Sequence, residues 1–223
     1  ISNEWPDFAD RGRTDKSNRL SYPYGVMINR DGLRFVDEGE DVGLYTYAKY
    51  GGEILKQPGS LAWQIFDQKT LHLLEPRYST SDPILADTLE ALVEKLEIDN
   101  RPQAVKTLHA YNDAACHADN FDPTMKDGLS TSGLSPEKTN WAQRLDSPPF
   151  AAYSATGGIT FTFGGLKVDE NAQVIGTDWR PIPGLFCCGE MVGGLFHFNY
   201  PGGTGLVSGA VFGRIAGKSA AGI

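Results

Sequence analysis

The chain has 223 residues, with 20 Lys+Arg against 28 Asp+Glu, so its formal net charge is −8. An apolar fraction of 40% with 11% aromatics is typical of a folded domain and excludes a disordered chain. The acidic balance, without a clustered basic face, argues against nucleic-acid binding, and no apolar run reaches the roughly 18 residues of a membrane span. Three cysteines are too few for a disulfide framework, so we expect a reducing, cytoplasmic location.

The first part of the chain carries signals for strands and one helix. Residues 24–36 predict a β-hairpin, because Asp31-Gly32 supplies the pair typical of tight turns. An acidic run over residues 37–41 follows, which is either a solvated loop or a cation site. A helix is expected over residues 45–55 and a strand over residues 60–67.

Two helices are expected next. Asp82 and Pro83 are typical of a helix start, and leucines recur behind them at helical spacing up to Leu96. Residues 99–102 break this helix, and a second one is expected over residues 103–117. The two are predicted to form an α-hairpin.

The remainder is rich in glycine and β-signals. Residues 119–147 are a long polar connection, and we place a domain boundary near Pro148-Pro149. Beyond it we expect a hairpin over residues 158–174, a short strand over 185–188 and a final helix after the glycine-rich turn at 201–204.

The final helix has glycines at every fourth position, namely Gly205, Gly209, Gly213 and Gly217. They form one stripe, and each costs about 1 kcal/mol against alanine, so a close approach of another backbone or a flat ligand is expected there. Thr204 is expected to cap the helix, whose first N–H groups would favour an anion or a polarised carbonyl. A tightly packed helix after an ordinary glycine turn is the alternative.

These motifs resemble a known family. Residues 148–223 look like the C-terminal part of the FAD domain in the fumarate reductase/succinate dehydrogenase flavoprotein superfamily, and residues 29–38 resemble the hairpin of its substrate-capping domain. Residues 18–25 and 45–50 look closest to the tricarballylate dehydrogenase branch, which includes the flavoprotein part of some precorrin-3B synthases. The matching tail motifs are Thr156-Gly-Gly-Ile, Pro183-Gly-Leu-Phe-Cys-Cys-Gly-Glu, Gly193-Gly-Leu-Phe-His-Phe-Asn-Tyr-Pro-Gly-Gly-Thr-Gly-Leu and Phe212-Gly-Arg-Ile-Ala-Gly.

The resemblance implies an α+β architecture. Residues 1–147 would be the substrate-capping domain, and residues 148–223 the C-terminal portion of a Rossmann-like FAD-binding domain. The Gly-x-Gly-x-x-Gly fingerprint that holds the FAD pyrophosphate does not occur in this sequence, so we expect a C-terminal fragment of a longer flavoprotein. The full-length protein would bind FAD, whereas the fragment alone would lack most FAD contacts, would not turn over and could self-associate.

By the same resemblance, several residues would contact FAD. Gly189 and Glu190 lie where the family meets the ribityl chain, and the start of the final helix would face the flavin pyrimidine edge. Two earlier glycines would let a strand approach the ring. The residues involved are Gly157, Gly158, Gly189, Glu190, Gly203, Thr204, Gly205 and Leu206.

Substrate chemistry needs a proton acceptor and groups that bind carboxylates. Tyr200, which replaces an arginine of the fumarate-reducing members and resembles the active tyrosine of the ketosteroid dehydrogenases, is the first catalytic candidate. His197 is the second, as acid/base, although a core histidine is the alternative. Arg19 and Thr204 are the candidates for substrate binding. The family's other histidine corresponds to Ser154, and residues 42–44 lack the arginine of its cap.

The sequence therefore predicts part of an FAD-dependent dehydrogenase that converts a tri- or dicarboxylate to its alkene, as in tricarballylate to cis-aconitate, with hydride passing to flavin N5. The alternatives are the flavoprotein part of a precorrin-3B synthase in cobalamin biosynthesis and a non-catalytic binding or assembly module. An electron-transfer partner protein is implied. No metal site is expected, because the histidines are scattered.

Overall fold

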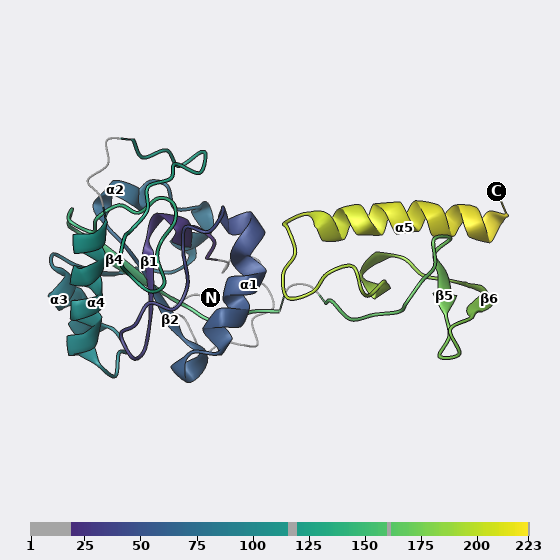
Figure 1. Ribbon diagram of the computed structural model, residues 1–223, viewed down its shortest axis with the longest axis horizontal. Helices are drawn as coiled ribbons and strands as arrows, with labels where there is room; N and C mark the ends of the chain where they lie inside the picture. The colour runs from purple at the N-terminus through teal and green to yellow at the C-terminus, as the bar shows by residue number, and fades with distance from the viewer. Residues whose placement is uncertain (1–18, 116–119, 160–161, 223) are drawn as a thin grey trace. The chain divides into compact units, whose positions relative to one another are not determined.

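The computed structural model describes residues 19–115, 120–159 and 162–222. The chain divides between Gly158 and Ile159 into two compact units, unit 1 before the division and unit 2 after it. Helices and strands occur in both, so the predicted mixture of helix and sheet is confirmed (Figure 1).

Unit 1 is built on a four-stranded antiparallel sheet in the order β1-β2-β4-β3. Its strands are β1 (Val26–Asn29), β2 (Ala62–Phe66), β3 (Ile84–Ala86) and β4 (Phe150–Ala155). The central pair, β2 and β4, runs in register from Ala62 opposite Ala155 to Phe66 opposite Ala151. Every residue of β1 and β2 is buried, so both faces of the sheet are covered.

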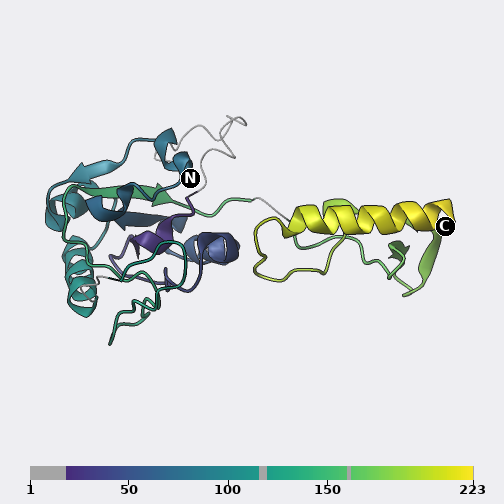
Figure 2. The same cartoon turned by 90° about the horizontal axis from the view of Figure 1, so that it is seen from above.

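Helices cover the two faces of this sheet (Figures 1 and 2). One face packs against α3 (Leu89–Lys95) and α4 (Arg101–Ala114), and the other against α1 (Gly43–Leu55). Val26 and Ile28 join the core with α3 and α4, whereas Met27 joins the core with α1. This alternation follows from the two-residue repeat of a strand.

The predicted strand over residues 60–67 and the helices over 45–55 and 103–117 are confirmed as β2, α1 and α4 over the described residues. The start of α4 has a clear local cause. Asn100 is its N-cap, and the side-chain oxygen accepts the N–H of Gln103 at 3.1 Å.

The hairpin predicted over residues 24–36 is only half formed. The turn is present, because Gly32 takes φ +77° and its N–H donates to the carbonyl of Asn29 at 3.0 Å. The residues after the turn form no strand, and β1 pairs instead with β2. Local turn chemistry therefore fixed the turn, while a distant segment supplied the pairing strand.

The helix predicted to begin at Asp82 starts later, at Leu89. Thr88 is its N-cap, and its hydroxyl accepts the N–H of Ala91 at 3.0 Å. The preceding residues form β3, in which Leu85 pairs with Ala151 of β4. Leucine spacing could not reveal this edge strand, because its partner lies far along the chain.

The polar connection after α4 contains neither helix nor strand over residues 120–147, yet it is well packed. Trp141 is 1% exposed, and its indole N–H donates to the carbonyls of Asp122 and Met125. Lys138 is fully buried, and its ammonium donates to the carbonyl of Gly25 at 2.5 Å. Shorter helical turns complete unit 1: η2 (Tyr22–Tyr24), η3 (Pro58–Ser60), α2 (Gln68–Leu71) and η4 (Pro76–Thr80).

The division between units falls later than the boundary expected at Pro148-Pro149. The physical reason is β4, which begins at Phe150 and pairs with both β2 and β3 of unit 1. The assignment of the two parts to a capping domain and an FAD-binding domain stays a prediction.

Unit 2 consists of a two-stranded antiparallel ribbon and one long helix. The ribbon pairs β5 (Gln173–Ile175) with β6 (Pro181–Phe186); η5 (Gly189–Met191) and α5 (Thr204–Ala221) follow. The predicted hairpin tip is present, since the N–H of Asp169 donates to the carbonyl of Gln173 at 3.0 Å. The core is small and joins Val174, Cys187 and Val192 with Phe212 of α5.

Candidate functional site

The start of α5 is the first element of the candidate site. Gly203 is its N-cap in the left-handed region, with φ +85°, and no side chain among the described residues caps the helix. The expected cap by Thr204 is wrong: Thr204 is already the first helical residue, and its hydroxyl donates to the carbonyl of Pro201 at 2.7 Å. The helix therefore begins with N–H groups that no side chain of the described residues covers. Such a helix start favours an anion or a polarised carbonyl as its ligand.

Gly189 and Glu190 lie beside this helix in unit 2. Gly189 opens η5 with φ +73°, and a Cβ built on Gly209 of α5 would lie 3.7 Å from its Cα. The carboxylate of Glu190 is held by Thr162, whose N–H and hydroxyl both donate to Oε1, at 2.7 and 2.9 Å. Glu190 is therefore a fixed carboxylate next to α5.

The glycine stripe of α5 makes less contact than its spacing predicts. Gly209 is in ordinary contact with Gly189, but a Cβ on Gly213 or Gly217 would meet nothing within 4 Å among the described residues. Leu206, the fourth expected FAD contact on this turn, is 84% exposed. The outer face of α5 is thus open in unit 2.

Unit 2 contains a close backbone approach that the sequence analysis missed. A Cβ on Gly165 would lie 2.4 Å from the carbonyl oxygen of Met191, and one on Gly193 would lie 2.5 Å from the N of Gly165. Hydrogen bonds between the N–H of Leu166 and the carbonyl of Met191, and between the N–H of Gly193 and the carbonyl of Leu166, hold the two segments together. The signal in the sequence is the pair Gly164-Gly165, since adjacent glycines permit a close backbone approach.

Gly157 and Gly158 themselves belong to unit 1. A Cβ on Gly157 would lie 2.4 Å from the side chain of Leu55 and 2.8 Å from the carbonyl oxygen of Gly51, so this glycine permits packing against α1. The role of these two glycines at FAD stays a proposal.

The two candidate catalytic residues lie just before α5. Tyr200 is buried, and its ring meets Phe163 at 5.7 Å and Phe196 at 5.8 Å between centroids, so neighbouring aromatic rings fix its orientation. His197 is exposed among the described residues, and its ring centroid lies 3.9 Å from that of Phe198. A buried phenol and an exposed imidazole therefore share one short segment.

Arg19 lies in unit 1 and is buried there. Its guanidinium donates to the carbonyl of Arg77 at 2.6 Å and to the hydroxyl of Ser81 at 2.5 Å, and stacks on Tyr78 and Tyr153. Burial lowers its pKa from the ordinary value. Its Nε has no partner among the described residues. Arg19 is thus held by its own unit rather than displayed on a surface loop.

The acidic run is part of the fold of unit 1. Glu38 is buried against Arg34, and Asp37 accepts the N–H and the hydroxyl of Thr139. Among the described residues, no three His, Cys, Asp or Glu side chains are arranged to hold a metal ion. Across the same residues, no helix has the length and apolarity that a membrane crossing requires.

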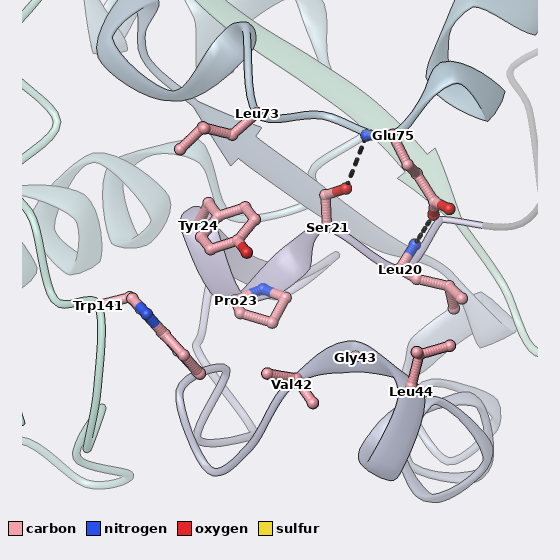
Figure 3. Close-up of a pocket in the computed structure, with 10 residues that line it drawn as sticks. All are labelled: Leu20, Ser21, Pro23, Tyr24, Val42, Gly43, Leu44, Leu73, Glu75 and Trp141. Atoms are coloured by element: carbon pink, nitrogen blue, oxygen red, sulfur yellow. Dashed lines mark hydrogen bonds between the residues drawn. The ribbon is translucent and has the colours of Figure 1, made fainter. Parts of the chain in front are cut away.

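A pocket of about 320 Å³ opens in unit 1 beside the start of α1 (Figure 3). Most of its walls are apolar, and Glu75 is its one charged lining residue, with Oε1 accepting the N–H of Leu20 at 2.8 Å. Val42 and Leu44 lie in the wall where the resemblance would put a cap arginine. A carboxylate would find no cationic side chain in this pocket. The lining residues are Leu20, Ser21, Pro23, Tyr24, Val42, Gly43, Leu44, Leu73, Glu75 and Trp141.

The residues of unit 2 fit a flavin dinucleotide on three counts. The left-handed Gly189 and Gly203 have open space where a Cβ would lie, so a ligand can reach their backbone. The uncapped N-terminus of α5 suits the flavin carbonyl edge, and the fixed carboxylate of Glu190 suits a sugar-alcohol hydroxyl.

Known proteins that are similar to this chain include oxidoreductases with fumarate or acrylate in their names. A probable fumarate reductase of Shewanella frigidimarina is 34% identical over 205 residues, covering 88% of this chain and 31% of that protein. An NADH:acrylate oxidoreductase of Vibrio harveyi is 34% identical over 197 residues, covering 87% of this chain and 18% of that protein. The open conformation of a flavocytochrome c3 fumarate reductase has a TM-score of 0.58 at 29% identity, over 90% of this chain and 33% of that chain.

The chain thus spans about a third or less of the length of these relatives. The expected likeness to fumarate reductase flavoproteins is confirmed, whereas the tricarballylate dehydrogenase and precorrin-3B synthase branches stay proposals. Residues 12–207 match the family described as FAD binding domain, which is most of the 223 residues. The chain therefore belongs to the FAD binding domain family.

Proposed function

We propose that this chain is part of an FAD-dependent oxidoreductase that acts on a C–C bond next to a carboxylate, and that its reaction is the dehydrogenation of tricarballylate to cis-aconitate. The names of the relatives support the general reaction, because fumarate and acrylate both carry a double bond beside a carboxylate. The motifs over residues 18–25 and 45–50 favour tricarballylate within this class.

One observation carries the cofactor assignment. Within unit 2, Glu190 is fixed beside α5, and α5 begins at a left-handed Gly203 that no side chain of the described residues caps. Hydroxyl groups suit the carboxylate, and a polarised carbonyl suits the helix start. We assign Gly203, Thr204, Gly205 and Leu206 to the carbonyl edge, and Gly189 with Glu190 to the sugar-alcohol chain.

Dehydrogenation breaks two C–H bonds. The hydrogen beside the carboxylate leaves as a proton to a base, and the hydrogen on the next carbon leaves with its electron pair. FAD, when bound, supplies the acceptor for that hydride. We assign the proton to the phenolate of Tyr200, whose ring is fixed by Phe163 and Phe196. The phenol proton that leaves to form this phenolate goes to His197, which is exposed and passes it to solvent.

The substrate carboxylates need cationic or N–H partners, and the pocket beside α1 offers no lysine, arginine or histidine among its lining residues. Arg19 stays our proposed carboxylate partner, because a guanidinium binds a carboxylate through two parallel N–H donors. Its Nη donors serve the carbonyl of Arg77 and the hydroxyl of Ser81, which the substrate would replace. Thr204 is proposed to donate its hydroxyl to a second carboxylate, in exchange for the bond that the hydroxyl makes to the carbonyl of Pro201. An electron-transfer partner protein would reoxidise the enzyme.

The test is product formation by the full-length protein that contains this chain. With tricarballylate and an artificial two-electron acceptor, the proposal predicts cis-aconitate and reduced acceptor in equal amounts. The reverse assay follows oxidation of a reduced dye by fumarate or acrylate, and it shows whether the protein reduces a C–C double bond next to a carboxylate. Bound FAD with turnover of neither substrate class would refute the carboxylate assignment, and oxidation of a corrin precursor would favour the precorrin-3B synthase alternative. A full-length protein that never binds FAD would favour the non-catalytic module.

A further inference from the structure

Two threonine–carboxylate contacts between residues far apart in the sequence look alike but differ in one respect. At Thr162, the N–H and the hydroxyl both donate to the same oxygen, Oε1 of Glu190, at 2.7 and 2.9 Å. At Thr139, the N–H donates to Oδ1 of Asp37 at 3.0 Å and the hydroxyl donates to Oδ2 at 2.7 Å. The Thr139 contact therefore uses both oxygens of its carboxylate, whereas the Thr162 contact uses one.

The backbone around Glu190 is also fixed. Glu190 sits in the short 3-10 turn η5, directly after the left-handed Gly189, whose Cα lies against Gly209 of α5. The side chain of Glu190 is exposed, so packing does not restrict its rotamers. Its hydrogen bonds to Thr162 do restrict them. An exposed glutamate loses much rotamer freedom when it binds a ligand, and a partner that fixes it beforehand removes that cost.

We propose that Thr162 is a positioning residue for cofactor binding: it holds Oε1 of Glu190 so that Oε2 accepts a hydroxyl of the polyhydroxylated chain of FAD. This inference rests on the proposed function, because it assumes that Glu190 meets the cofactor. Both oxygens of a carboxylate accept hydrogen bonds, so Oε1 can bind Thr162 while Oε2 binds a hydroxyl of the cofactor. The contact also gives a role to a residue that lies outside every motif quoted above for FAD.

The experiment measures the Kd of FAD for the full-length protein by equilibrium dialysis and flavin fluorescence, without turnover. Thr162→Val keeps the backbone N–H and the shape but removes the hydroxyl donor. We expect its Kd to rise about fivefold to tenfold, which is the size of one charge-assisted hydrogen bond on an exposed group. Thr162→Ser keeps the donor and is expected to restore a Kd close to that of the parent protein.

Thr139→Val is the matched control, because it removes the same hydroxyl–carboxylate bond in unit 1. Its Kd for FAD is expected to be unchanged, even if the protein loses stability. In a Glu190→Gln background, Thr162→Val is expected to raise the Kd no further, since the two residues act as one unit.

Three results would overturn the inference: an unchanged Kd in Thr162→Val, a rise of equal size in Thr139→Val, or full additivity of Thr162→Val with Glu190→Gln. Failure of the proposed function looks different, because the parent protein itself would then show no measurable Kd for FAD. Should Thr162→Val not fold, the comparison of Thr162→Ser with the parent protein decides, and a large rise in its Kd contradicts the inference.

Discussion

The buried ion pair between Arg34 and Glu38 allows a quantitative test of how unit 1 is stabilised. Both side chains are almost fully buried, at 4% and 0% exposed, and Nη2 of Arg34 lies 2.5 Å from Oε2 of Glu38. Oε1 of Glu38 also accepts Nε of Arg34 at 3.1 Å and the N–H of Met27 at 2.8 Å. Burial alone would lower the pKa of Arg34, but the charge of Glu38 overcomes it and raises that pKa above the ordinary value. Glu38→Gln keeps the shape of the side chain and leaves the guanidinium buried without its counter-charge.

We expect Glu38→Gln to lower the unfolding free energy strongly. Removing one partner of a buried pair costs about 3–5 kcal/mol of unfolding free energy, because the remaining charge stays desolvated. Glu53→Gln is the control in the same unit, since Glu53 and Lys56 form a pair at 2.7 Å with side chains 32% and 68% exposed. An exposed pair of this kind is worth about 0–1 kcal/mol.

Urea unfolding of the chain, followed by tryptophan fluorescence, measures both variants. Trp63 and Trp141 are buried in unit 1, at 4% and 1% exposed, so their emission reports the unfolding of that unit. A loss below about 1 kcal/mol in Glu38→Gln, or a loss equal to that of Glu53→Gln, would refute the reasoning.

Three further predictions follow from the same structure. Burial lowers the pKa of Lys138 to about 8. The unfolded chain therefore binds this proton more tightly than the folded chain, and the unfolding free energy rises with pH above 8. Relative to Lys138→Met, we expect the unfolding free energy to gain roughly 2 kcal/mol between pH 7.5 and 9.5 in urea titrations, and parallel pH curves for the two proteins would contradict this. In α1, a Cβ on Gly43 would lie 2.3 Å from the carbonyl oxygen of Leu20, whereas one on Gly52 meets nothing within 4 Å among the described residues. In thermal unfolding, Gly43→Ala should therefore destabilise the protein by about 1–3 kcal/mol, and Gly52→Ala should stabilise it by about 0.5–1 kcal/mol. Equal effects of the two substitutions would exclude the steric reason. In the full-length protein, Tyr200→Phe should lower kcat about a hundredfold or more while FAD stays bound, and an unchanged kcat would remove Tyr200 from the mechanism.

Local patterns predicted the elements whose causes are local. The turn was predicted from Asp31-Gly32, and Gly32 takes the positive φ that such a turn requires. The helix expected from residue 103 begins at Arg101, because Asn100 caps it. The long helix α5 was found although its glycines are poor helix formers, because the glycine-rich turn before it marks its start. These features depend on residues within one or two turns of each other.

Features that depend on distant partners could not be predicted. The pairing of β3 with β4, and hence the late division between units, is decided by residues such as Leu85 and Ala151 that lie far apart in the chain. The same holds for the close approach of Gly165 to Met191 and for the contact of Thr162 with Glu190. Spacing alone also predicted a contact along the whole glycine stripe of α5, whereas a Cβ on Gly209 meets Gly189 and one on Gly213 or Gly217 meets nothing within 4 Å among the described residues.

We propose that this chain supplies part of an FAD site and that the bound FAD oxidises a carboxylate substrate. The visible spectrum of the full-length protein, recorded anaerobically before and after addition of tricarballylate, tests it most directly. We expect a bound flavin band that bleaches when tricarballylate is added, because hydride transfer reduces the cofactor. A flavin band that persists with tricarballylate would contradict the proposed substrate, and the absence of any flavin band after incubation with FAD would contradict the cofactor site itself.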